Sequence, residues 1–222
     1  MRILVALSSI FLSLAAFAAE APPSADKAVT YTAGKEYEVL AEPVRPLDPN
    51  KIEVSEVFAY TCPHCMHFEP LIEAWIKKQQ PDVSLVQIHT MWAPQMEPYQ
   101  RGFYTLVTLK VKDKVQLAVF DAVHTQHKEL SNAQAWADFL APYGVDKKAV
   151  LSTYDSFGVT SQIKQADART RGYKITGTPE LVIDGKYRIN ATMGGGHEGM
   201  LKVAQFLVDR SEERRVGKEC LR

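Results

Sequence analysis

The chain has 222 residues, of which 46% are hydrophobic and 23% are charged. This is ordinary globular composition, and the length allows one well-buried core or a domain that carries a large insertion. Because 26 basic residues balance 26 acidic residues, the composition gives no reason to expect nucleic acid or an anionic membrane surface as a partner.

The first residues have the pattern of a secretory signal. Arg2 precedes an apolar run over residues 3–17, and Ala16-Phe17-Ala18 supplies small residues at alternate positions. A membrane anchor is the alternative, but the run is short for a span, and polar and proline residues follow it at once. We therefore expect residues 1–18 to be a cleaved signal peptide and the mature protein to be exported to a compartment where disulfides persist.

The first half of the remaining chain has the pattern strand, helix, strand. Residues 37–40 are expected to form a short edge strand. Residues 52–60 alternate in polarity as a strand does, and they are bounded by Pro49 and Pro63. Pro63 suits the first position of a helix, whose apolar residues recur at helical spacing up to Pro81. Residues 83–88 then form a second core strand.

The second half begins with residues 94–173, which have helical periodicity throughout. Two short apolar runs, 181–183 and 187–189, then flank Asp184-Gly185, a strong hairpin signal. A glycine loop leads into a last helix with an apolar stripe at Met200, Val203 and Leu207. We therefore expect residues 19–93 and 174–209 to form one α/β domain, interrupted by a helical domain at 94–173.

The last residues differ from the rest of the chain. The run Arg210–Cys220 is polar and lacks a helical stripe, and its eleven residues match the translation of a widely used short-read sequencing adapter. A solvated basic tail would fit the same composition. We interpret residues 210–222 as adapter-derived and expect them to pack poorly from Ser211 onward.

Setting Cys220 aside leaves one cysteine pair, in the sequence Cys62-Pro63-His64-Cys65. Two cysteines three residues apart on the first turn of a helix can satisfy disulfide geometry. Cys62 would lie at the helix N-terminus, where backbone N–H groups and the helix dipole favour a thiolate, and His64 would favour it further. A stabilised thiolate stabilises the reduced form, so the disulfide becomes more oxidising, by about 30 mV per 1.4 kcal/mol.

Two other interpretations of the pair compete with redox chemistry. A structural disulfide is possible, although so short a loop removes little entropy from the unfolded chain. Half of a zinc site is possible, although a tetrahedral site needs four ligands and no second cysteine pair exists. His124 and His127 are three apart on an expected helix, but no third metal ligand is apparent; like His89 and His197, they receive no role.

Residues 56–65 read Glu-Val-Phe-Ala-Tyr-Thr-Cys-Pro-His-Cys and are followed by Phe68-Glu69-Pro70, and residues 176–188 run from Thr-Gly-Thr-Pro to Lys-Tyr-Arg. Both stretches resemble the DsbA family of thioredoxin-fold oxidases. The resemblance spans about residues 31–208. It implies an α/β thioredoxin fold with a helical domain inserted between the two halves of the sheet.

The resemblance also implies roles for individual residues. Cys62 is the exposed sulfur that substrates attack, Cys65 is its shielded partner, and His64 tunes the thiolate. Pro179 is a cis-proline that faces the disulfide, and Thr178 before it contacts substrate. Glu56 resembles the buried acid that the family places near the second cysteine; the alternative is an edge-strand carboxylate that faces water.

The activity that the resemblance implies is that of a periplasmic thiol:disulfide oxidoreductase. It would donate its disulfide to unfolded exported proteins with free thiols, as a monomer without a cofactor, and a DsbB-like membrane quinone reductase would reoxidise it. A disulfide isomerase or reductase, or a cysteine-based metal-binding module, remains as an alternative.

Overall fold

The computed structural model describes residues 30–219, without the side chains of 214–219. The expected signal peptide and Cys220 lie outside the described residues. Helices and strands follow the expected order: strand, helix, strand, a helical block, then a hairpin and a last helix. In the described part of the chain, no helix is both long enough and apolar enough to cross a membrane.

Five strands form one mixed sheet in the order β1-β5-β4-β2-β3. They are β1 (Glu38–Val39), β2 (Ile52–Phe58), β3 (Val83–His89), β4 (Glu180–Ile183) and β5 (Tyr187–Asn190). Strands β2 and β3 are parallel, while β4 pairs antiparallel with both β2 and β5. Every residue of β2 is buried, as expected for the strand that joins the two halves of the sheet.

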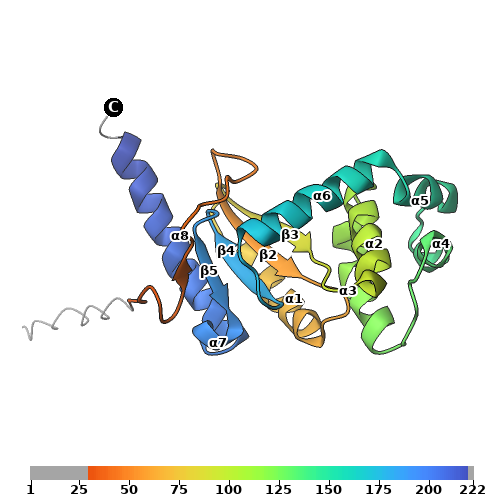
Figure 1. Ribbon diagram of the computed structural model, residues 1–222, viewed down its shortest axis with the longest axis horizontal. Coiled ribbons are helices and arrows are strands. Elements are labelled where there is room, and N and C mark those ends of the chain that lie inside the picture. The colour runs from red at the N-terminus through yellow and green to blue at the C-terminus, as the bar shows by residue number, and fades with distance from the viewer. Residues whose placement is uncertain (1–29, 220–222) are drawn as a thin grey trace, which may run out of the picture.

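The helical block stands between β3 and β4 in the chain, which confirms the expected thioredoxin fold with a helical insertion. Figure 1 shows helices α2–α5 gathered at one end of the molecule and α8 at the other, with the sheet between them. The helices are α1 (Pro63–Ile76), η1 (Pro94–Met96), α2 (Glu97–Thr108), α3 (Lys112–His124), α4 (Ala133–Leu140), η2 (Ala141–Tyr143), α5 (Lys147–Tyr154), α6 (Phe157–Gly172), α7 (Ala191–Gly194) and α8 (His197–Glu219).

Two apolar clusters hold these layers together. One lies between the sheet and the helical block and contains Trp136, which is fully buried. A Cβ atom on Gly102 of α2 would lie 2.0 Å from the Trp136 ring, so α2 and α4 pack closely only because this residue is glycine. The other cluster joins the sheet to α1 and α8 and includes the predicted stripe of Met200, Val203 and Leu207.

The predicted hairpin is present between β4 and β5. Asp184 and Gly185 have φ angles of 51° and 62°, the left-handed conformation that both central residues of a type I′ turn require. A Cβ atom on Gly185 would also lie 1.8 Å from the carbonyl oxygen of Val44. This position therefore needs glycine for its backbone conformation and for the neighbouring chain.

The end of the chain differs from the expectation. Helix α8 continues to Glu219, because the glutamate and arginine residues of the tail have high helix propensity. The expected poor packing does not begin at Ser211, which is buried and donates a hydrogen bond to the carbonyl of Leu207. Glu212 is half-buried and Glu213 is exposed, and the side chains of the rest of the tail lie outside the described residues.

Candidate redox-active site

The cysteine pair lies where β2 leads into α1. Cys62 is the N-cap residue of α1 in an extended conformation, and Pro63 occupies the first helical turn, where its missing N–H costs no hydrogen bond. The carbonyl of Cys62 accepts hydrogen bonds from the N–H groups of Cys65 and Met66. Cys62 is half-buried and Cys65 is fully buried, and both are free thiols.

Cys62 is strongly stabilised as a thiolate. A hydrogen bond from the Cys65 thiol lowers the pKa of Cys62 from 9.0 to about 5, against an opposing effect of burial. The Thr178 side chain and the backbone N–H groups of Cys65 and His64 contribute in the same direction. Cys62 is the N-cap residue of α1, so its sulfur lies beside the first N–H groups of the helix, which lack partners within the helix and favour a negative charge.

Cys65 has the opposite electrostatic environment. Burial raises the pKa of the Cys65 thiol far above its ordinary value, and the hydrogen bond to Cys62 and the negative charge there raise it further. At neutral pH one sulfur is therefore an accessible thiolate and the other a shielded thiol. Because of that asymmetry, an incoming thiolate reacts at Cys62 rather than at Cys65.

The segment before β4 brings the second half of the chain to Cys62. The peptide bond between Thr178 and Pro179 is cis, as the resemblance implied, and Pro179 is buried. The carbonyl oxygen of Thr178 lies 3.4 Å from Cys62 Sγ, within reach of a hydrogen bond from the thiol. Residues 116 positions apart in sequence thus meet at one sulfur.

Glu56 lies in the middle of β2 and is fully buried, so the alternative of an exposed edge-strand carboxylate is wrong. The side-chain amide of Gln87 donates to Glu56 at 2.8 Å and to Glu69 at 2.9 Å. Burial, together with the negative charge of Glu69, raises the pKa of Glu56 to about 8. Lys112 Nζ donates to Gln87 Oε1 at 2.5 Å and brings a positive charge toward the pair.

Sequence reasoning gave no role to Glu69, Gln87 and Lys112. A signal existed for Glu69, because it lies on the buried face of α1 with Cys65, Phe68 and Ile72. A carboxylate on an apolar helix face needs a partner. Gln87 and Lys112 give no such signal, since each lies on a different element and is polar at a half-buried position.

Comparison with known proteins agrees with this geometry. A family model described as a DSBA-like thioredoxin domain matches residues 90–207, which is more than half of the chain. The chain belongs to the DsbA family. A protein of Pseudomonas aeruginosa named thiol:disulfide interchange protein DsbA is 42% identical over 186 residues, which cover 84% of this chain and 88% of that protein.

Other relatives extend the match over both halves of the sheet. The Burkholderia cepacia protein of the same name is 37% identical over 213 residues, 95% of this chain and 98% of that one. A crystal structure of Pseudomonas aeruginosa DsbA superposes with a TM-score of 0.79 at 42% identity and covers 85% of this chain and 97% of that one. The DsbA of Xylella fastidiosa superposes with a TM-score of 0.77 at 29% identity, over 82% and 98% of the two chains.

Two histidine rings, those of His64 and His197, lie near the cysteine pair. The exposed His64 ring lies 6.3 Å from that of His197, the first residue of α8, and His197 also contacts Phe68 at 5.2 Å between ring centroids. Burial, followed by the charges of His64 and His67, lowers the pKa of His197. The backbone N–H of His64 contributes to the lowered pKa of Cys62.

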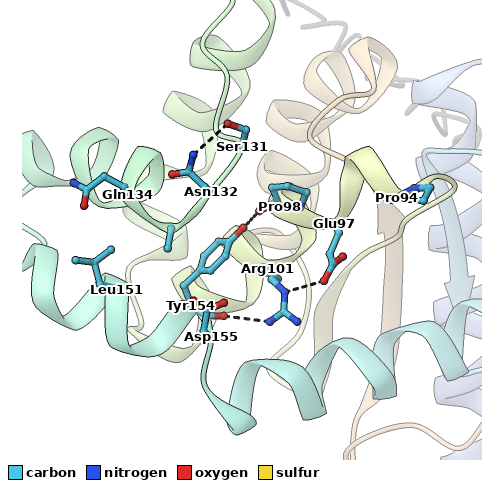
Figure 2. A pocket seen from close by; sticks show the side chains of 11 residues that line it. Pro94, Glu97, Pro98, Arg101, Ser131, Asn132, Gln134, Leu151, Tyr154 and Asp155 are labelled. Carbon is cyan, nitrogen blue, oxygen red and sulfur yellow. Dashed lines mark hydrogen bonds and ion pairs between the residues drawn. The ribbon is translucent and has the colours of Figure 1, made fainter.

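The helical block of this DsbA-family protein contains a pocket of about 530 Å³ between α2, α4 and α5 (Figure 2). Arg101 is the cation of this pocket, and its guanidinium already bonds Glu97 and the carbonyl of Tyr154. None of the redox-site residues lines the pocket. Across residues 30–219, no three histidine, cysteine or acidic side chains are grouped as a metal site would require.

Proposed function

We propose that this DsbA-family protein is a dithiol oxidase that transfers the Cys62–Cys65 disulfide to newly exported proteins. The observation that carries the proposal is the asymmetry of the two sulfurs. The pKa of the half-buried Cys62 is lowered to about 5, while the buried Cys65 is held as a thiol. A thiolate stabilised in the reduced form makes the disulfide a stronger oxidant.

The transfer proceeds through two exchange steps. A substrate thiolate attacks Cys62 Sγ, forms a mixed disulfide and breaks the bond to Cys65, which leaves as a thiolate. A second substrate thiolate then attacks the substrate sulfur of the mixed disulfide, and Cys62 leaves as a stable thiolate. The substrate dithiol loses two electrons and two protons, and the enzyme disulfide becomes a dithiol.

The leaving sulfur of Cys65 needs a proton, because burial makes its thiolate unfavourable. Glu56 carries one at neutral pH, since its pKa is raised to about 8. We propose that Glu56 supplies this proton in the first step and takes it back when the disulfide reforms. The negative charge of an ionised Glu56 raises the pKa of Cys65, which supports a proton exchange between the two groups.

Substrate recognition is assigned to the segment before β4. An extended peptide can add to exposed backbone as a further strand, with affinity from main-chain hydrogen bonds. The Thr178 carbonyl, 3.4 Å from Cys62 Sγ, would pair with the residue next to the substrate cysteine. Pro179, which follows it, keeps that segment beside the sulfur.

The protein would act in the periplasm, with a membrane partner and exported substrates. The sequence of residues 1–18 indicates export, and we propose the periplasm as the site of action and a monomer as the working form. A DsbB-like membrane quinone reductase would accept the two electrons of the dithiol and restore the disulfide. Unfolded exported proteins with free thiols would be the substrates.

Equilibration of the purified protein with a glutathione redox buffer tests the proposal. An oxidase is predominantly reduced at glutathione ratios that leave ordinary structural disulfides intact, and its oxidised form converts a dithiol peptide to the disulfide. The Cys62→Ser variant should lose all transfer, and Cys65→Ser should accumulate mixed disulfides. A potential as low as that of a reductase, with slow peptide oxidation, would instead favour the reductase alternative.

A further inference from the structure

Tyr60 lies between the end of β2 and Cys62 and is fully buried. The N–H of Cys62 donates to the carbonyl of Ala59 at 3.0 Å, so residues 59–62 form a β-turn with Tyr60 and Thr61 at its centre. The ladder with β3 ends before this turn. The backbone N–H and carbonyl of Tyr60 are therefore buried without a strand partner, and such groups need hydrogen bonds from elsewhere.

Two histidine rings supply these hydrogen bonds. The N–H of Tyr60 donates to His89 Nε2 at 3.0 Å, and His124 Nε2 donates to the carbonyl oxygen of Tyr60 at 2.8 Å. His89 is fully buried, and its ring packs against the rings of Phe58, Tyr60 and Phe103. Burial lowers the pKa of His89 to about 3, so its ring is neutral and its Nε2 is free to accept.

His124 comes from the helical block. It is the last residue of α3 and is half-buried. The same helix binds Tyr60 through its side chain, because the Tyr60 hydroxyl donates to Gln116 Oε1 at 2.5 Å and Phe120 packs edge-on against the Tyr60 ring. Side chains of α3 thus contact both the backbone and the side chain of Tyr60, two positions before Cys62.

We propose that His124 is a positioning residue for thiol–disulfide exchange at Cys62. Its hydrogen bond fixes the peptide between Tyr60 and Thr61, which is the central peptide of the turn. In a β-turn this peptide separates type I from type II geometry and is the one that rotates between them. The turn ends at Cys62, so a turn that lacks this hydrogen bond would hold the sulfur less firmly relative to Thr178 and the helix N–H groups.

The inference rests on the proposed function, since exchange at Cys62 is the reaction whose geometry His124 maintains. Reaction rates at a preorganised site fall when the reacting atom moves by about 1 Å. A hydrogen bond remote from the sulfur can therefore matter for the rate. His127, three residues further on, is exposed and provides a comparison on the same segment.

The test compares one substitution at both histidines in the full chain. His124→Asn removes the donor, because the amide nitrogen of asparagine lies closer to the backbone than Nε2 of an imidazole. His127→Asn is the matched control, and asparagine tolerates the φ of 51° at that position. His124→Gln restores a donor of sufficient reach. The readouts are the thiolate titration of Cys62 and the rate of oxidation of a dithiol peptide.

We expect His124→Asn to oxidise the peptide about three- to tenfold more slowly and to raise the pKa of Cys62. His127→Asn should match the wild type, and His124→Gln should recover most of the loss. Equal behaviour of the two asparagine variants would overturn the proposal. So would a His124→Gln variant as slow as His124→Asn, because the donor would then not be the cause.

The titration and one further measurement decide the outcome if the peptide assay or the variant fails. If the wild-type protein does not oxidise the peptide, the proposed function fails, and the thiolate titration still decides whether His124 positions Cys62. If His124→Asn does not fold, nitrogen NMR of the wild-type imidazoles replaces it. The proposal requires a proton on His124 Nε2 and none on His89 Nε2, and the reverse protonation on either ring would overturn it.

Discussion

The free energy of unfolding should differ between the reduced and the oxidised protein, and this difference should change with pH because of Cys62. Oxidation of the pair removes the thiolate. The pKa of Cys62 is lowered to about 5 in the fold, from an ordinary value of 9.0. A group with a lowered pKa contributes stability that is complete above its unfolded pKa and is lost as the pH falls through the folded one. Only the reduced protein has this contribution.

The magnitude follows from proton linkage. Between these two pKa values of Cys62, the reduced fold binds about one proton fewer than the unfolded chain. Its free energy of unfolding therefore rises by up to about 1.4 kcal/mol per pH unit. At about pH 7 this amounts to about 2.7 kcal/mol, and we take about 2 kcal/mol because water screens the half-exposed sulfur.

The disulfide has an opposing effect on the oxidised form. In the chain-entropy model, closing the loop of residues 62–65 constrains the unfolded chain and stabilises the oxidised protein by about 2 kcal/mol. The two forms should therefore be similar in stability near pH 7. Above that pH the reduced form should be the more stable one, and near pH 5 the oxidised form.

Urea denaturation of both redox forms at several values between about pH 5 and about pH 8 measures this difference. Groups that titrate alike in both forms cancel when one free energy of unfolding is subtracted from the other. The reduced Cys62→Ser variant is the control, because it lacks the thiolate and should lose the slope. A difference that stays constant over this range, or that favours the oxidised form as the pH rises, would refute the reasoning.

Three further predictions concern the acid, the histidine and the tail. Glu56→Gln should stabilise the fold by about 1–4 kcal/mol in alkaline urea melts. The reason is that the raised pKa of Glu56 makes the wild type lose stability as the pH rises toward about 8. Equal stability of the variant and the wild type would argue against a buried charge. His64→Leu keeps the backbone N–H that lowers the pKa of Cys62. Thiolate titration should therefore show a smaller rise in the pKa of Cys62 for His64→Leu than for His64→Pro, which lacks that N–H. The opposite ranking would assign the effect to the ring. Deleting residues 211–222 should leave peptide oxidation unchanged and cost less than about 1 kcal/mol in a thermal melt, since the hydroxyl of Ser211 donates within its own helix. A loss of activity would show that the tail takes part in function.

The sequence alone determined the order of the elements and the chemistry of the cysteine pair. The apolar periodicity of residues 52–60 predicted β2, Pro63 predicted the start of α1, and Asp184-Gly185 predicted the hairpin. Each of these signals is local, because a helix or strand exposes its own repeat and a turn needs particular residues. The same reasoning placed Cys62 at a helix N-terminus and so predicted its stabilised thiolate.

Only the tertiary structure decided what surrounds that pair. Gln87 bridges Glu56 and Glu69, and Lys112 reaches Gln87 from the helical block. His124 and Tyr60 are 64 residues apart and share a hydrogen bond. Periodicity reports which face of an element is buried, whereas the partner of a buried polar group depends on how separate elements pack. For that reason the sequence predicted that Cys62 would be reactive, and the fold decided which groups hold it in place.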